Sequence, residues 1–214
     1  MRPTLMNKGI KAESRGSFSV QEYKTLYTIL RTWHKKTTNV QQAATREILR
    51  NYVLILANTG MRQGTEALQL KWKNIEWVYK GDERYLAFNV DGKTGKRQCI
   101  ARDRAEEFFW RQAKLNPKIN AESFEELLKQ KFDEKVFTTC LGEAARLPNL
   151  IRAFKKLLDE QNLYVGADCK KRTLYSLRHF YATQELERGM STHALARQMG
   201  TSTKMIDKHY SKYA

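Results

Sequence analysis

The amino-acid sequence predicts an α+β fold that is mostly helical and contains one small three-stranded antiparallel sheet. Two observations lead to this prediction. Helix-capping residues followed by apolar positions at helical spacing recur before residue 72 and after residue 103. Between them, three short stretches rich in β-branched and aromatic residues are separated by turn-forming pairs. The 214 residues are enough for one sizeable hydrophobic core.

Three helices are expected before the sheet. The segment Ser19-Val-Gln-Glu22 has the spacing of a capping box and predicts a helix to about Lys36. A second helix is expected over Val40 to Asn58, because Gly60 can adopt the left-handed conformation that ends a helix. Thr65 can cap a third, short helix toward Lys71.

The sheet is expected from three strands over Ile75 to Tyr79, Tyr85 to Val90 and Gln98 to Arg102. The pairs Gly81-Asp82 and Asp91-Gly92 are turn signals between them. Short connections of this kind join antiparallel neighbours.

Helices resume after the sheet. They are expected from about Arg104 to Lys114, from a capping box at Ser123, from Pro148 to Gln161, from a Thr173 cap to Gly189, from Ser191 to Gly200, and onward from Thr203.

The charge of the chain indicates its partner. Lys and Arg number 39 against 23 Asp and Glu, which gives a net charge of +16. Such an excess opposes compaction and is typical of proteins that bind a polyanion. Nucleic acid is favoured over an anionic membrane, because no basic amphipathic helix stands alone and no apolar run is long enough to span a bilayer. The three separated cysteines, Cys99, Cys140 and Cys169, form no CxxC pair and favour a reducing cytoplasm over a disulfide or zinc framework.

Two basic patterns are candidates for chemistry. In Asn58-Thr-Gly-Met-Arg62-Gln-Gly-Thr-Glu66, an arginine sits in a glycine-flanked turn where a guanidinium and backbone donors can face one phosphate. The alternative is a surface arginine beside an ordinary helix–helix turn. The hairpin Asp91-Gly-Lys93-Thr-Gly-Lys96-Arg97 carries three cations and can enter a DNA groove, or it is simply a solvated turn.

Two further patterns lie near the C-terminus. In Leu174-Tyr-Ser-Leu-Arg178-His179-Phe-Tyr-Ala-Thr183, Arg178 lies near the apolar face of a helix and therefore needs an anionic partner, in an active site or in a structural ion pair. His179 is interpreted as a helix-packing residue. The last pattern ends at His209-Tyr210, where the tyrosine is either a packing aromatic or a nucleophile.

Together and in this order, the four patterns resemble the tyrosine recombinase (phage integrase) family. The family has an arginine in a TG-[LM]-R turn, a lysine on a hairpin of the KTGK type, an LRH-x-x-AT helix, and an LG-[HW] turn with a tyrosine nine residues later. Here Thr201 occupies the His/Trp position, nine residues before Tyr210. The resemblance covers about Ser17 to Tyr213 and implies the integrase-type catalytic fold.

The resemblance also implies roles for single residues. Arg62 and Arg178 would bind the non-bridging oxygens of the scissile phosphate, and Lys93 would protonate the departing 5′-hydroxyl, with Lys96 as a nearby alternative. Tyr210 would attack phosphorus and form a 3′-phosphotyrosine. Guanidiniums placed where charge develops suit phosphoryl transfer without a metal or other cofactor. Lys96 and Arg97 would contact DNA.

Two positions depart from the family pattern. Tyr175 stands where the family has a histidine three residues before the second arginine, and Thr201 stands at the His/Trp position. The hypothesis is that Tyr175 or Thr201 hydrogen-bonds the phosphate, while His209 or the phosphate itself takes the tyrosine proton. Glu66 lies one place later than the usual acidic residue, which is consistent with one extra residue in the turn.

The whole-chain prediction is a linker over residues 1–16, from an upstream DNA-binding domain, and a catalytic domain over residues 17–214. The resemblance implies a cytoplasmic, bacterial or phage-encoded enzyme that integrates or excises a mobile element in double-stranded DNA. It implies a tetramer on DNA, a monomer when free, and accessory DNA-bending proteins. A type IB topoisomerase and a DNA-binding relative that has lost catalysis are the alternatives.

Overall fold

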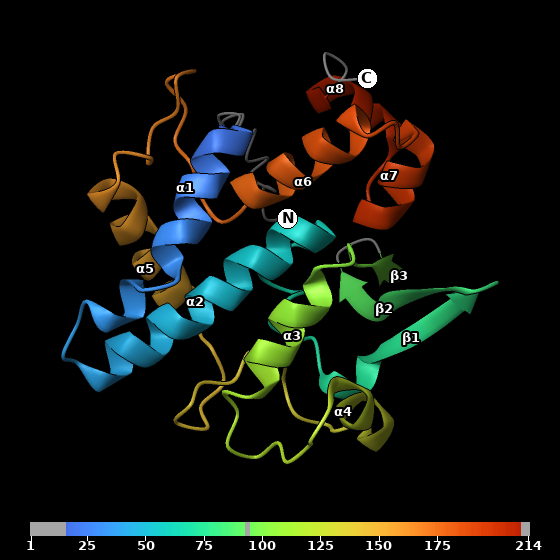
Figure 1. The fold of residues 1–214 in the computed structure, drawn as a ribbon. Coiled ribbons are helices and arrows are strands. Elements are labelled where there is room, and N and C mark those ends of the chain that lie inside the picture. Colours follow the sequence, from blue (N-terminus) through green and yellow to red (C-terminus); the bar gives the residue numbers. More distant parts are fainter. Residues whose placement is uncertain (1–15, 93–94, 211–214) are drawn as a thin grey trace, which may run out of the picture.

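The computed structural model describes residues 16–92 and 95–210 (Figure 1). Within these ranges the α-helices are α1 (Val20–Leu30), α2 (Val40–Thr59), α3 (Ala105–Ala113), α4 (Phe124–Gln130), α5 (Leu147–Glu160), α6 (Ser176–Glu187), α7 (Thr192–Met199) and α8 (Thr203–Tyr210). The strands are β1 (Ile75–Lys80), β2 (Glu83–Gly92) and β3 (Gly95–Ile100), and the 3₁₀ turns are η1 (Trp33–Lys35) and η2 (Trp72–Asn74).

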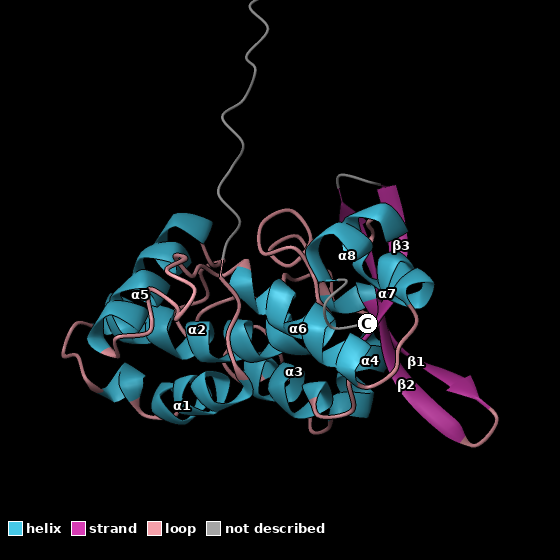
Figure 2. Ribbon diagram, turned by 90° about the horizontal axis from the view of Figure 1, so that it is seen from above, coloured by secondary structure: helices cyan, strands magenta, loops and turns pink. Residues whose placement is uncertain are grey.

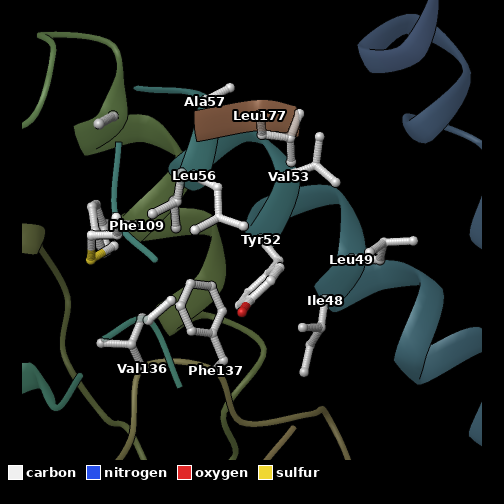
Figure 3. Close-up of a cluster of buried hydrophobic side chains, with 14 of the residues drawn as sticks. Ile48, Leu49, Tyr52, Val53, Leu56, Ala57, Phe109, Val136, Phe137 and Leu177 are labelled. Atoms are coloured by element: carbon white, nitrogen blue, oxygen red, sulfur yellow. The ribbon is translucent and has the colours of Figure 1, made fainter. Parts of the chain in front are cut away.

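Helix α2 is the centre of the main hydrophobic core. Most of its side chains are buried on all sides, because α1, α3, α5 and α6 all pack against it. Figure 3 shows Tyr52 of α2 pointing toward Phe137, and the two rings meet edge-on with centroids 4.7 Å apart. A helix so enclosed is held by packing rather than by intrinsic helix propensity. The core therefore fixes the C-terminal end of α2, where the candidate site begins.

The sheet lies at one end of the helical body, and its strand order is β1-β2-β3 with antiparallel pairing (Figure 2). The register pairs Phe88 of β2 with Ile75 of β1 and with Cys99 of β3, and all three side chains are buried. Helix α7 packs on β3. The end of the β2–β3 pair is thereby held beside the C-terminal helices.

A second, smaller core cluster joins the last three helices. It consists of buried side chains of α6, α7 and α8: Tyr181, Ala182, Leu186, Leu195, Ala196, Met199, Ile206 and Tyr210. The burial of Ile206 and Tyr210 means that α8 docks on the protein through one face. This cluster sets the position of the predicted nucleophile.

The predicted α+β class and the antiparallel sheet are confirmed, as are most helices, with ends that differ by a few residues. Three helix ends are confirmed by their caps: Ser19 forms a full capping box, and Gly60 and Gly200 end their helices in the left-handed conformation. Ser123 caps α4 by accepting from the Glu126 backbone, although the Glu126 carboxylate accepts from Glu122.

Two predicted helices are wrong in extent or existence. The first ends at Leu30, and η1 follows, because the chain turns there to bury Trp33. The predicted helix from Thr65 to Lys71 is a series of hydrogen-bonded turns. The Glu66 carboxylate accepts a hydrogen bond from the Arg62 backbone at 2.8 Å, so the turn is organised by a buried acid rather than by a Thr65 cap.

The predicted linker over residues 1–16 lies almost wholly outside the described residues. Among the described helices, none combines the length and the apolar character that a bilayer crossing requires.

Candidate functional site

The candidate site begins at the turn that follows α2. Gly60 has a φ of +66°, and a Cβ there would lie 2.5 Å from the ring of Tyr181, so both conformation and space call for glycine. The turn that follows places Arg62 and Glu66 side by side, and their side chains form an ion pair. Glu66 is only 1% exposed, whereas the Arg62 side chain keeps 21% of its surface open to solvent.

Glu66 binds a second guanidinium, that of Arg97 on β3. Both terminal nitrogens of Arg97 donate to the two carboxylate oxygens at 2.7 Å, in the bidentate geometry that arginine favours. Burial alone would raise the pKa of Glu66, but the hydrogen bonds from Arg97 and Arg62 outweigh burial and lower it to about 2. Glu66 is therefore a permanent anion that positions two cations.

The end of the β2–β3 pair lies against this cluster. A Cβ on Gly92 would lie 2.3 Å from a carboxylate oxygen of Glu66, so only glycine fits beside it. Lys93, the predicted proton donor, follows directly in the sequence but lies outside the described residues. Lys96 is exposed opposite Asp91, whereas Arg97 turns inward with 11% of its side chain exposed.

Arg178 on α6 is 3% exposed and lies beside the same cluster. One terminal nitrogen donates to the carbonyl of Gly60, and the other donates to the carbonyl of Met199 at 2.6 Å. Of the two alternatives for an anionic partner, the structural ion pair is not formed within the described chain, where the hydrogen bonds of Arg178 go to backbone carbonyls. Burial lowers its pKa from the ordinary value, as do the nearby charges of Arg62 and Arg97, while Tyr175 and Glu66 oppose this.

Three arginines from distant parts of the chain meet at the C-terminal end of α7. Arg97 donates to the carbonyl of Gln198 at 3.1 Å, Arg178 to that of Met199, and Arg62 to that of Gly200 at 2.5 Å. The last carbonyls of a helix lack intrahelical partners and carry the negative end of its dipole. The end of α7 is thus the point on which the guanidiniums converge.

Tyr210 is the last residue of α8 and is 6% exposed. Its hydroxyl lies 2.5 Å from Nδ1 of His179, which is one residue beyond Arg178 on α6. Burial raises the pKa of Tyr210 above the ordinary tyrosine value; Tyr175 raises it further, and the nearby charge of Arg178 opposes the shift. The predicted nucleophile and the second predicted arginine therefore face the same region.

The remaining predicted residues surround this tyrosine. Tyr175 precedes α6 and meets the His179 ring edge-on, with centroids 5.2 Å apart. His209 is exposed, and its ring centroid lies 6.3 Å from that of Tyr210. Thr201 is half-buried and directly follows the carbonyl that Arg62 binds, while its own backbone N–H closes the end of α7 on Ala196.

Two features of the site were missed at the level of sequence. Arg97 was expected to face DNA, but it is the bidentate partner of Glu66; alternation along β3 relative to exposed Lys96 was the signal for its inward direction. His179 was interpreted as a packing residue, although it contacts the Tyr210 hydroxyl. Its position one turn after Tyr175 was the available signal.

The model of the phage integrase family matches residues 17–214. Comparison with curated protein sequences returns no match.

Several solved recombinase structures share the fold. The XerH site-specific recombinase bound to palindromic difH substrate, in a post-cleavage complex, aligns with a TM-score of 0.62 and 18% identity over 91% of this chain and 49% of that one. XerA recombinase aligns with a TM-score of 0.63 and 17% identity, over 98% of this chain and 63% of that one. A lambda integrase dimer bound to a COC′ core site aligns with a TM-score of 0.60 and 15% identity, over 93% of this chain and 60% of that one. The chain thus spans about half to two thirds of the length of these proteins.

Proposed function

The chain belongs to the phage integrase family, and from that premise we propose that it is the strand-cleaving and rejoining part of a site-specific DNA recombinase. The observation that carries the proposal is the meeting of Arg62, Arg178 and Arg97 at consecutive carbonyls of the α7 end, with Tyr210 on the next helix. Glu66 balances one of these three like charges, and the remaining excess of positive charge favours an anionic ligand, since like charges repel.

In this proposal the scissile phosphate binds between Arg62 and Arg178. A guanidinium has five N–H donors, and the backbone carbonyls take two from Arg178. Arg97 stays on Glu66 and keeps the Arg62–Glu66 unit in place. Two guanidiniums held in advance stabilise the charge that develops on the phosphoryl oxygens, and loss of one such group typically costs roughly 10²–10³ in rate.

Tyr210 attacks phosphorus and forms a 3′-phosphotyrosine, and the P–O bond to the 5′-oxygen breaks. Lys93 gives the departing oxygen a proton; Gly92, its neighbour, lies against Glu66, which supports this assignment. Rejoining is the reverse reaction, with the free 5′-hydroxyl as nucleophile, and needs no external energy source because the phosphodiester is conserved.

The partner is double-stranded DNA, as the net charge of +16 favours. XerH is bound to a palindromic difH substrate and lambda integrase to a COC′ core site in their structures, which supports the same kind of partner here. We place the chain in the integration or excision of a mobile element in a bacterial cytoplasm. It acts as a tetramer on DNA, is a monomer when free, and works beside accessory DNA-bending proteins.

The test is capture of a covalent adduct. The chain is incubated at micromolar concentration with duplexes that carry a nick in a randomised segment, so that cleavage releases a short oligonucleotide and traps the protein. A DNA–protein adduct that survives denaturant and maps to Tyr210 by mass spectrometry is expected, and sequencing of the trapped DNA identifies a substrate. Tyr210→Phe is expected to bind the same DNA and to form no adduct.

Two outcomes would contradict the proposal. DNA binding without any adduct identifies a DNA-binding relative that has lost catalysis. An adduct accompanied by efficient relaxation of supercoiled plasmid, with no transfer of strands between duplexes, identifies a topoisomerase.

A further inference from the structure

His179 is a direct polar partner of the proposed nucleophile. Its Nδ1 lies 2.5 Å from the Tyr210 hydroxyl, within the reach that proton transfer requires. The two rings are tilted with centroids 5.5 Å apart, so the contact is made through the polar atoms at the edges of the rings. The contact joins α6 to α8, the two elements that carry Arg178 and Tyr210.

The imidazole of His179 lies one helical turn from one of the predicted site residues. His179 follows Tyr175 by four residues, which is about one helical turn, and the two rings touch. Arg178, which precedes His179 in the chain, donates to the carbonyls of Gly60 and Met199. One turn of α6 therefore presents a cation for the phosphate and an imidazole for the tyrosine.

The chemistry needs a proton acceptor at this point. Tyrosine is a weak nucleophile while it keeps its proton, and burial raises the pKa of Tyr210 above the ordinary value. The hydroxyl does not ionise by itself near neutral pH in such a setting. A neutral imidazole is the side chain best suited to accept a proton between pH 6 and 8.

We infer that His179 is a further catalytic residue: its Nδ1 accepts the Tyr210 proton as the phenolic oxygen attacks phosphorus. The inference rests on the proposed strand cleavage. The O–P bond to Tyr210 forms, the P–O5′ bond breaks, the tyrosine proton moves to His179, and the 5′-oxygen takes its proton from Lys93. In rejoining, the imidazolium returns its proton to Tyr210 as the phosphotyrosine breaks.

The groups that face His179 limit the choice of test residues. Among the described residues they include Tyr175 at the start of α6 and, on α8, Tyr210 and His209, whose ring centroid lies 6.4 Å away. Arg178 is the adjacent residue in the chain. Because His209 also borders Tyr210 and is the other candidate acceptor of the tyrosine proton, His209→Ala is the competing variant. His193→Ala, which removes an exposed imidazole from α7, is the control.

The experiment measures how fast the whole chain forms the covalent adduct. The substrate is the nicked duplex whose sequence was identified from the randomised set. His179→Ala is expected to slow the rate roughly 10²–10⁴-fold, the usual contribution of a general base. His179→Asn can still accept a hydrogen bond near the Nδ1 position but cannot act as a base, so it is expected to be equally slow. His193→Ala is expected to match the parent chain, and imidazole in the buffer is expected to restore part of the rate of His179→Ala. A fall in rate for His209→Ala as large as that for His179→Ala would contradict the inference.

The pH profile and a modified substrate separate chemistry from structure. The parent rate is expected to rise with pH as the imidazole loses its proton, and this step is expected to be absent in both His179 variants. A duplex with sulfur in place of the bridging 5′-oxygen has a leaving group that needs no proton; it is expected to rescue Lys93→Ala and not His179→Ala.

Several results would overturn the inference. A rate for His179→Asn near that of the parent chain would show that His179 only positions the tyrosine, and an unchanged pH profile in His179→Ala would remove it from proton transfer. Both results presuppose that the parent chain forms the adduct, and so leave strand cleavage standing. If the parent chain forms no adduct, strand cleavage itself is rejected, and the role of His179 with it. Circular dichroism and DNA binding identify a variant that has failed to fold, and His179→Asn and His179→Gln then replace His179→Ala.

Discussion

Among single residues, Glu66 has the largest organising effect on the site, because one buried carboxylate holds both Arg62 and Arg97. Guanidiniums are cationic at any ordinary pH, so Glu66 is not needed to keep either arginine charged. Their directions, however, depend on the acid between them. A surface carboxylate could not do this, because exposed ion pairs contribute little and leave both side chains mobile.

The lowered pKa of Glu66 makes a prediction about stability and pH. A carboxyl whose pKa falls from 4.5 to about 2 on folding stabilises the protein fully above pH 4.5, and this contribution is lost as the pH falls toward 2. Glu66→Gln is expected to lower the free energy of unfolding at pH 7 by on the order of 3 kcal/mol. Urea unfolding at pH 7, 4.5 and 3 is expected to show the gap between the two proteins narrowing as the pH falls.

Asp159→Asn is the control for that comparison, because Asp159 forms an exposed ion pair with Lys155 within α5. It is expected to change the free energy of unfolding by less than about 0.5 kcal/mol. A gap between the parent chain and Glu66→Gln that stayed constant down to pH 3 would contradict the assignment of a buried, ionised Glu66.

Among the elements, the C-terminal end of α7 has both a structural and a functional role. Gly200 ends the helix with a φ of +61°, and a Cβ there would lie 2.7 Å from the Arg97 guanidinium. The carbonyl of the same residue accepts from Arg62. One glycine therefore ends the helix, leaves room for one arginine and binds another.

Gly200→Ala is accordingly expected to lower the stability of the protein by more than the backbone strain at the helix end would by itself. Gly189, which follows α6, also has a positive φ of +88°, but a Cβ there would meet nothing within 4 Å. Gly189→Ala is expected to lose about 1–2 kcal/mol of stability from the left-handed conformation. Thermal unfolding is expected to show a larger loss for Gly200→Ala, with slower adduct formation only in that variant. Equal losses in the two variants would mean that Arg97 moves aside at no cost.

In the molecule as a whole, positive charge is not confined to the candidate site. A hollow of about 680 Å³ between α1, α2, α3 and α6 is lined by six arginines: Arg31, Arg50, Arg102, Arg104, Arg111 and Arg188. Burial, and next the charge of Arg50, lowers the pKa of Arg111 to about 10. Phe180 and Gln184 also line it, and at about 100° per residue they project roughly 200° and 240° around α6 from Arg178. The hollow and the candidate site thus lie on different sides of α6.

This arrangement predicts which charges contribute to duplex binding. Each phosphate contact contributes to the dependence of the binding constant on salt, so removal of one contact lowers the slope of log K against log[salt] by about 1. Lys96→Gln, beside the candidate site, is expected to produce that change. Arg104→Gln removes the same charge from an exposed residue of the hollow and is expected to leave the slope unchanged. Fluorescence anisotropy of a labelled duplex from about 50 to 200 mM salt measures both, and equal slopes for the two variants would contradict the assignment of the binding face.

Local signals in the sequence determined most of the elements and the identities of the expected site residues. The capping box at Ser19, the glycine at position 60 and the Gly81-Asp82 turn between β1 and β2 act over a few residues, so they can be recognised without the fold. The other turn pair, Asp91-Gly92, instead forms the end of β2. The short helix expected from Thr65 failed because a buried side chain, which no local rule describes, competes for the backbone.

Only the tertiary structure decided how those residues meet. Arg62 and Gly200 are 138 residues apart in the chain, and Arg97 and Glu66 are 31 apart, yet each pair is in contact. Such contacts depend on how α2, the sheet and α7 pack around one core, which is a property of the whole chain rather than of any window in it. The same packing brought His179 to the Tyr210 hydroxyl, where a helix pattern read alone predicted a packing residue.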